Sequence, residues 1–159
     1  LKGPLHGGAN EEVMHMMNKI KTPNYALKWI KNVLKKKEVV MGFGHRVYKS
    51  GDSRVPTMKQ YFENVCRLKK DKKFLKIYEI VEKEMIDKKN IHPNVDYPTG
   101  PTYHLMGFDT DFFTPIFVMS RITGWSAHIM EQHASNKLIR PLAKYKGNKH
   151  RRVMLLNQR

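Results

Sequence analysis

The spacing of the apolar side chains limits what this chain can fold into more than any other feature, because it follows a helical period along most of the sequence. Helix-spaced apolar residues occupy the segments at about 10–22, 25–36, 56–68 and 72–89. A short helix is expected to end near Gly107, and a long one to run from Thr114 to Ala134. Asn10 is the expected cap of the first helix. Strand content is expected to be minimal, so the predicted fold class is all-α.

The long helix carries apolar side chains on almost every side, which is typical of a helix buried all round. Arg121 lies in the middle of that apolar run. A buried guanidinium without a partner is costly, so we expect Arg121 to have one. Two partners fit the residue type. One is an acidic side chain in a buried salt bridge, and the other is the carboxylate of a ligand, which arginine binds through two parallel hydrogen bonds.

The chain is strongly basic, with 30 lysines and arginines against 14 acidic residues and a net charge of +16 over 159 residues. Lysines outnumber arginines by 22 to 8, whereas the reading of base edges favours arginine. We therefore expect solvated lysine-rich helix faces and a field that attracts a small anion, in preference to nucleic-acid binding. A single cysteine, Cys66, excludes a disulfide framework and a thiolate zinc site, and fits a reducing compartment. No apolar run is long enough for a membrane span.

Three loops rich in glycine or proline hold side chains suited to acid–base chemistry. His6 lies in the run 3–10, just before a helix start, which can keep a histidine neutral. His45 lies among glycines and cations in the segment 42–54, and Asp96 lies in a predicted turn that contains three prolines within residues 91–101. Each loop taken alone is equally typical of an ordinary turn. Together they suit enolisation of a thioester or ketone, combined with binding of a polycarboxylate.

Several of these runs also match a known family, in its order and with its spacing. The matching segments are 3–11 (Gly-Pro-Leu-His-Gly-Gly-Ala-Asn-Glu), 42–49 (Gly-Phe-Gly-His-Arg-Val-Tyr-Lys), 94–96, 113–117, 120–121, 124–125 and 139–141. With these residues the chain resembles the C-terminal portion of the citrate synthases over essentially its whole length. The runs 102–107 and 121–128 and the ending 156–159 are more like those of the 2-methylcitrate synthases.

The resemblance implies catalytic roles for three residues. Asp96 looks like the base that removes a proton from the α-carbon of an acyl-CoA. His6 looks like the partner that hydrogen-bonds the thioester oxygen of the enol, and His45 resembles the histidine that polarises the oxaloacetate carbonyl and protonates the new alkoxide. Hydrolysis of the thioester follows the condensation. These positions hold the residue types that the family uses.

The resemblance also implies binding residues. Arg54 and Arg121 match arginines that clamp the carboxylates of oxaloacetate, and Arg140 matches one supplied to the neighbouring subunit, which implies a homodimer. Lys49 matches a contact to a phosphate of coenzyme A. The loop that reads the adenine of coenzyme A corresponds to Val39, Val40, Met41, Gly42, Phe43 and Gly44. No permanently bound cofactor, metal, membrane or nucleic acid is implied, and the expected location is the cytoplasm, or the mitochondrial matrix in a eukaryote.

The resemblance divides the chain into residues 1–9 of a large domain, a small CoA-binding domain at about 10–90, and a return to the large domain over 91–159. Ser53 stands where many members have proline. The family's N-terminal half has no counterpart here, so the segment alone is expected to expose apolar helices, to fold poorly and to be inactive. The expected function is condensation of oxaloacetate with propionyl-CoA. The alternatives are acetyl-CoA as the substrate, a non-catalytic CoA-binding fragment, and a basic nucleic-acid-binding module.

Overall fold

A computed structural model describes residues 8–48, 50–144, 146–147 and 154–158, and over these it is helical, as predicted. His6 and Lys49 lie outside the described residues. The elements in chain order are α1 (Ala9–Ile20), α2 (Pro23–Lys36), α3 (Val55–Leu68), α4 (Lys73–Lys89), α5 (Asp96–Met106), the short 3₁₀ turn η1 (Thr110–Phe112), α6 (Phe113–Ala134) and a second 3₁₀ turn, η2 (Leu156–Gln158). Extended pairing within the described residues is limited to one isolated bridge, between Phe43 and Pro93.

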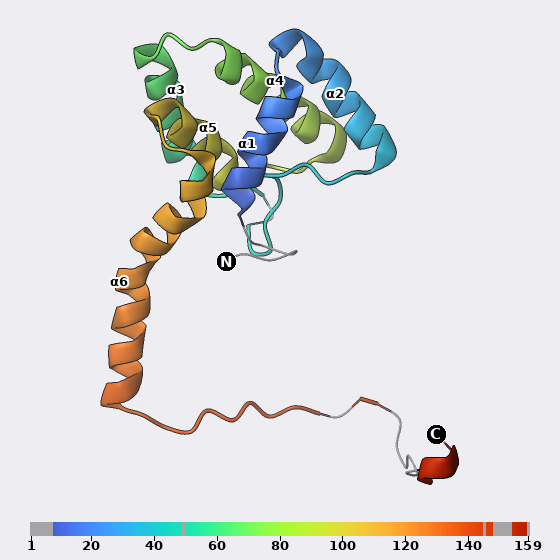
Figure 1. The fold of residues 1–159 in the computed structure, drawn as a ribbon, viewed down its shortest axis with the longest axis vertical. Coiled ribbons are helices and arrows are strands. Elements are labelled where there is room, and N and C mark those ends of the chain that lie inside the picture. Colours follow the sequence, from blue (N-terminus) through green and yellow to red (C-terminus); the bar gives the residue numbers. More distant parts are fainter. Residues whose placement is uncertain (1–7, 49, 145, 148–153, 159) are drawn as a thin grey trace. The chain divides into compact units, whose positions relative to one another are not determined.

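The chain divides into two compact units, Leu1–Thr123 and Gly124–Arg159. In the first unit, α1 contacts α2, α4 and α5, while α2 packs on α4 and α3 packs on α5 (Figure 1). The side chains with no exposed surface in this core are Val13, Met14, Met17, Ile20, Ala26, Ile30, Phe62, Ile77, Tyr78, Val81, Tyr97 and Phe113. Because α1 supplies four of these twelve, it is the helix around which the others assemble.

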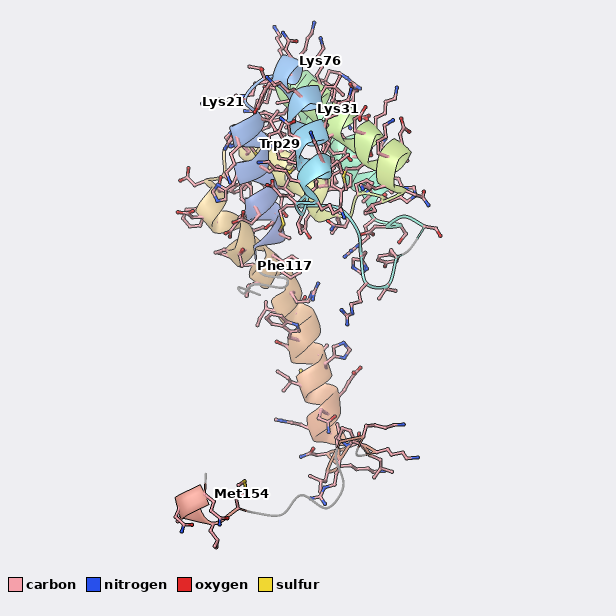
Figure 2. All side chains as sticks on the ribbon, turned by 90° about the vertical axis from the view of Figure 1, so that its right-hand side faces the viewer. Lys21, Trp29, Lys31, Lys76, Phe117 and Met154 are labelled. Carbon is pink, nitrogen blue, oxygen red and sulfur yellow. The ribbon has the colours of Figure 1, made fainter. Side chains whose placement is uncertain are left out.

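The lysine-rich helix faces are solvated, as predicted. Lys21, Lys31 and Lys76 are exposed and project from the helical surface (Figure 2). No helix in the described part of the chain is long and apolar enough to cross a membrane.

Two predicted helix starts differ from the structure. Gly8, not Asn10, precedes the first helical residue, with a left-handed φ of 61° that glycine adopts without strain. Asn10 therefore lies inside the first turn, where it is buried and its Oδ1 accepts a hydrogen bond from the Glu11 N–H at 3.0 Å. The predicted turn over 91–101 is wrong from Asp96 onward, because α5 begins there. Pro98 falls in the first turn of α5, where a helix needs no backbone donor.

The prediction of a buried long helix is also wrong for this chain. In α6 only Phe113 is buried, while Ile122, Ile129 and Met130 expose at least half of their surface. A helix that is apolar on all sides needs neighbours on all sides, and the described elements cover only its beginning. The expectation that the segment exposes apolar helices is therefore confirmed.

Candidate active site

A short stretch of backbone pairing joins the two loops that carry His45 and Asp96. The Gly44 N–H donates to the His92 carbonyl at 2.9 Å, and the Asn94 N–H donates to the Gly42 carbonyl at 2.8 Å. The Asn94 side-chain amide donates to the Gly44 carbonyl at 2.9 Å. These bonds hold the loop that leads into His45 against the residues that precede Asp96, which are about fifty positions away in the sequence.

Gly42 has a structural reason to be glycine in this pairing. Its φ is +84°, and a Cβ on it would lie 2.8 Å from both the Tyr97 Cβ and the Val13 Cγ2. The Phe43 ring packs on the Tyr97 ring with centroids 4.4 Å apart. Along the predicted adenine-reading loop, Val40 is buried whereas Val39 is 83% exposed. The loop is thus anchored from its second residue onward on α1 and α5.

The His45 ring is oriented by its own loop. Its Nδ1 accepts hydrogen bonds from the Val47 N–H at 3.0 Å and the Tyr48 N–H at 3.2 Å. A ring nitrogen that accepts carries no proton, so in the neutral ring the proton sits on Nε2. The ring also packs on Tyr48, with centroids 4.7 Å apart. His45 can therefore act as a neutral hydrogen-bond donor through Nε2.

Arg54 is held by Asp52, a residue that was not among the site residues predicted from the sequence. The Arg54 Nε and Nη2 donate to the Asp52 Oδ1 and Oδ2 at 2.9 and 2.7 Å, and the Arg54 backbone N–H donates to Oδ1 at 3.0 Å. The hydrogen bonds from the Arg54 side chain outweigh burial and lower the pKa of Asp52 to about 2. The same pair raises the pKa of Arg54. The Asp52 side chain is 1% exposed and that of Arg54 is 45% exposed, so the guanidinium keeps an edge toward solvent.

Asp96 is the first residue of α5 and lies close to this pair. The Asp52 Oδ2 accepts the N–H of Val95 at 3.1 Å, and the Asp96 N–H donates to the Asn94 Oδ1 at 3.0 Å. The charge of Asp96 contributes to the raised pKa of Arg54, after the larger effects of Asp52 and burial. Its charge also contributes, after burial, to the raised pKa of Tyr103. The structure thus places Arg54 close to Asp96, and His45 is connected to Arg54 through Tyr48, whose ring contacts the His45 ring and the Arg54 guanidinium.

Arg121 and Arg140 belong to later parts of the chain, α6 and the second unit. Arg121 is exposed on α6, so its predicted burial is wrong, and its guanidinium lies over the Phe117 ring at 4.6 Å. The reason is the exposure of α6 itself, which leaves the middle of the helix in contact with solvent. Arg140 is exposed in the second unit.

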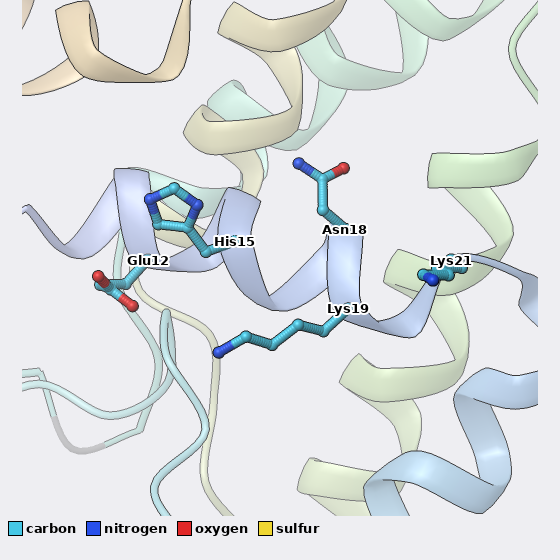
Figure 3. A pocket seen from close by; sticks show the side chains of 5 residues that line it. All are labelled: Glu12, His15, Asn18, Lys19 and Lys21. Atoms are coloured by element: carbon cyan, nitrogen blue, oxygen red, sulfur yellow. The ribbon is translucent and has the colours of Figure 1, made fainter.

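A surface pocket of about 440 Å³ lies elsewhere, on α1. Its lining residues are Glu12, His15, Asn18, Lys19 and Lys21 (Figure 3). All five come from one helix and the residue after it, and none of them is a predicted site residue. Over the described ranges, no group of three or more histidines, cysteines or acidic residues is placed to hold a metal. That the activity needs no metal ion stays a prediction.

The fold and this geometry define a class: an all-helical protein that places a neutral histidine, an oriented arginine and a carboxylate around one loop junction, as acid–base chemistry on an anionic substrate requires. The family model for the citrate synthase C-terminal domain matches residues 1–142. The chain belongs to the citrate synthase family.

Relatives in this family divide between two activities. The chain is 58% identical over 151 residues to a 2-methylcitrate synthase of Mycobacterium tuberculosis, covering 95% of this chain and 38% of that protein. It is 56% identical over 154 residues to a citrate synthase of Mycolicibacterium smegmatis, covering 97% and 41%. The chain thus spans about two fifths of the length of these curated relatives.

A solved structure shows the same fold. The chain matches citrate synthase from Thermoplasma acidophilum, solved in ternary complex with carboxymethyl coenzyme A and oxaloacetate, with a TM-score of 0.78 and 39% identity. The match covers 100% of this chain and 44% of that one. The all-helical fold predicted from the sequence is therefore that of the C-terminal part of a citrate synthase.

Proposed function

We propose that this chain is the C-terminal part of a 2-methylcitrate synthase, which condenses oxaloacetate with propionyl-CoA and then hydrolyses the thioester. The observation that carries the proposal is the junction of the 42–54 and 92–96 segments, which gathers His45, Arg54 and Asp96. The identity of 58% to a relative named for this activity supports the choice of substrate.

In the proposed reaction, the Asp96 carboxylate takes a proton from the carbon next to the thioester carbonyl. Negative charge then moves onto the thioester oxygen, where His6 donates a hydrogen bond. The enol carbon attacks the keto carbon of oxaloacetate, and the keto oxygen takes the proton from the His45 Nε2 as it becomes a hydroxyl. The proton that Asp96 removed from the acyl-CoA replaces the one that His45 gave up. Water then attacks the thioester carbonyl, and the coenzyme A thiol leaves with a proton.

The binding roles follow the same proposal. Arg54, Arg121 and Arg140 hold the carboxylates of oxaloacetate, with Arg140 supplied to the neighbouring subunit of a homodimer. Lys49 contacts a phosphate of coenzyme A, and the adenine-reading loop is Val39, Val40, Met41, Gly42, Phe43 and Gly44. The domain division at about residues 10 and 90 belongs to the proposal as well.

The test is release of the coenzyme A thiol by the full-length protein that contains this chain, with oxaloacetate and either propionyl-CoA or acetyl-CoA. We expect turnover with a preference for propionyl-CoA, and its loss in Asp96→Asn with the helical content retained. Undiminished turnover in that variant would overturn the role of Asp96.

A second candidate is ordinary citrate synthesis, which the 56% identity to a relative named citrate synthase favours. Preference for acetyl-CoA in the same assay would select it. Binding of coenzyme A without turnover of either substrate would indicate the non-catalytic fragment instead.

A further inference from the structure

We propose that Asp52 is a positioning residue that sets the orientation of Arg54 and the placement of Asp96 at the same time. The inference rests on the proposed function, because it assigns Asp52 to the same site. Asp52 acts through its two neighbours and does not touch the substrate, since its side chain is 1% exposed.

The carboxylate of Asp52 is fully engaged by donors from two separate segments. Oδ1 accepts from the backbone N–H and the Nε of Arg54, at 3.0 and 2.9 Å. Oδ2 accepts from the Nη2 of Arg54 at 2.7 Å and from the Val95 N–H at 3.1 Å. One buried anion therefore connects the loop that ends at α3 with Val95, the residue that precedes α5.

The first connection orients the guanidinium of Arg54. A guanidinium has more N–H groups than the two that Asp52 engages, and its remaining edge can bind a carboxylate of the substrate. The Arg54 guanidinium also lies over the Tyr48 ring at 5.5 Å, which supports it from a second side. Without Asp52, a side chain that is nearly half exposed would have to be ordered when the substrate binds.

The second connection fixes the start of α5. Val95 is the N-cap of this helix, with a φ of −60°, and its N–H donates a hydrogen bond to the Asp52 Oδ2. Asp96 follows as the first helical residue, so a shift of Val95 moves the carboxylate that takes the proton. A displacement of about 1 Å in such a group can lower the rate by about 100-fold.

Three variants of the full-length protein separate these effects. Asp52→Asn keeps the size of the side chain but replaces one carboxylate oxygen with an NH₂ group. This group then faces N–H donors of Arg54 or Val95 and cannot accept their hydrogen bonds. Val95→Pro removes the backbone N–H that donates to Asp52, and a φ of −60° already suits proline. Glu82→Gln is the matched control: it also breaks an ion pair of 2.7 Å, with Lys59, between α3 and α4 and away from the site.

We expect Asp52→Asn to raise the KM for oxaloacetate and to lower kcat, each by about 10- to 100-fold, with the KM for the acyl-CoA unchanged. Val95→Pro should lower kcat by at least about tenfold and leave the KM for oxaloacetate unchanged. Glu82→Gln should change neither constant, although its thermal unfolding temperature should fall.

Unchanged constants in Asp52→Asn, or the same changes in Glu82→Gln, would overturn the inference. Where Asp52→Asn does not fold, Val95→Pro still decides, because an unchanged kcat there refutes the connection to Asp96. If the unmodified protein releases no thiol from either acyl-CoA, the proposed function fails and this inference falls with it. Turnover by the unmodified protein with unaltered variants refutes this inference alone.

Discussion

The junction beneath the candidate site depends on a glycine, so Gly42→Ala is a direct test of its packing. A methyl group at this position would lie 2.8 Å from the Tyr97 Cβ, 2.8 Å from the Val13 Cγ2 and 3.0 Å from the Tyr97 Cα. Tyr97 and Val13 are both fully buried, on α5 and α1. Neither can move away without disturbing the contact between these two helices.

Two costs add up at this position. A residue other than glycine in the left-handed region costs roughly 1–2 kcal/mol, and the φ of Gly42 is +84°. Forcing a methyl group into a packed core costs roughly a further 1–3 kcal/mol. We therefore expect Gly42→Ala to lower the free energy of unfolding by about 2–5 kcal/mol. Gly107→Ala is the matched control, because Gly107 has a φ of +95° and nothing within 4 Å of its Cβ position.

The assay is urea unfolding of the full-length protein that contains this chain, followed by far-ultraviolet circular dichroism. Gly107→Ala should lose only the backbone part, about 1–2 kcal/mol, and Gly42→Ala should lose clearly more. Equal losses in the two variants would refute the close packing of the loop on Tyr97 and Val13. A full-length protein in which Gly42→Ala is as stable as the unmodified protein would refute it as well.

Three further predictions follow from buried groups. Burial raises the pKa of the Cys66 thiol to about 12, so Cys66 should not react with a thiol reagent at mildly alkaline pH until the chain is unfolded. The pKa of Asp52 is lowered from 3.8 to about 2, so its contribution to the free energy of unfolding is present above about pH 4 and is lost as the pH falls toward 2. Asp52→Asn should therefore lack the loss of stability between about pH 4 and pH 2. Tyr97→Phe removes a buried hydrogen bond of 3.0 Å to the Tyr78 carbonyl and should lower the midpoint of urea unfolding by an amount equivalent to about 1 kcal/mol.

Most helices could be predicted from the sequence, because a helical period is a local property that neighbouring residues reveal. The errors arose where local signals have two meanings. Proline near Asp96 suggested a turn, although Pro98 is compatible with the first turn of α5. The apolar sides of α6 predicted burial, but a pattern cannot say which element provides the cover.

The candidate site was predicted in part, for a related reason. The glycine-rich segment before His45 and the turn before Asp96 are visible in the sequence, yet their pairing depends on Asn94 and on backbone contacts about fifty residues apart. Asp52 was missed because an aspartate two residues before an arginine is common in turns. Only its burial and its bond to Val95 distinguish it.

The side chains of Arg54 and Arg121, two of the arginines proposed to bind oxaloacetate, are oriented to different degrees before a ligand binds. This difference affects how tightly the chain alone can bind a carboxylate. Arg54 is already oriented by Asp52, so little side-chain entropy remains to be lost when a carboxylate binds. Arg121 is exposed and lies over Phe117 on an uncovered helix, so ordering it on a ligand costs about 1.5–2 kcal/mol of side-chain entropy. Under the proposed function, the junction of the 42–54 and 92–96 segments should therefore bind one carboxylate weakly on its own. Tight binding of a dicarboxylate should then require the apolar sides of α6 to be covered first, because a packed helix would hold Arg121 in one orientation.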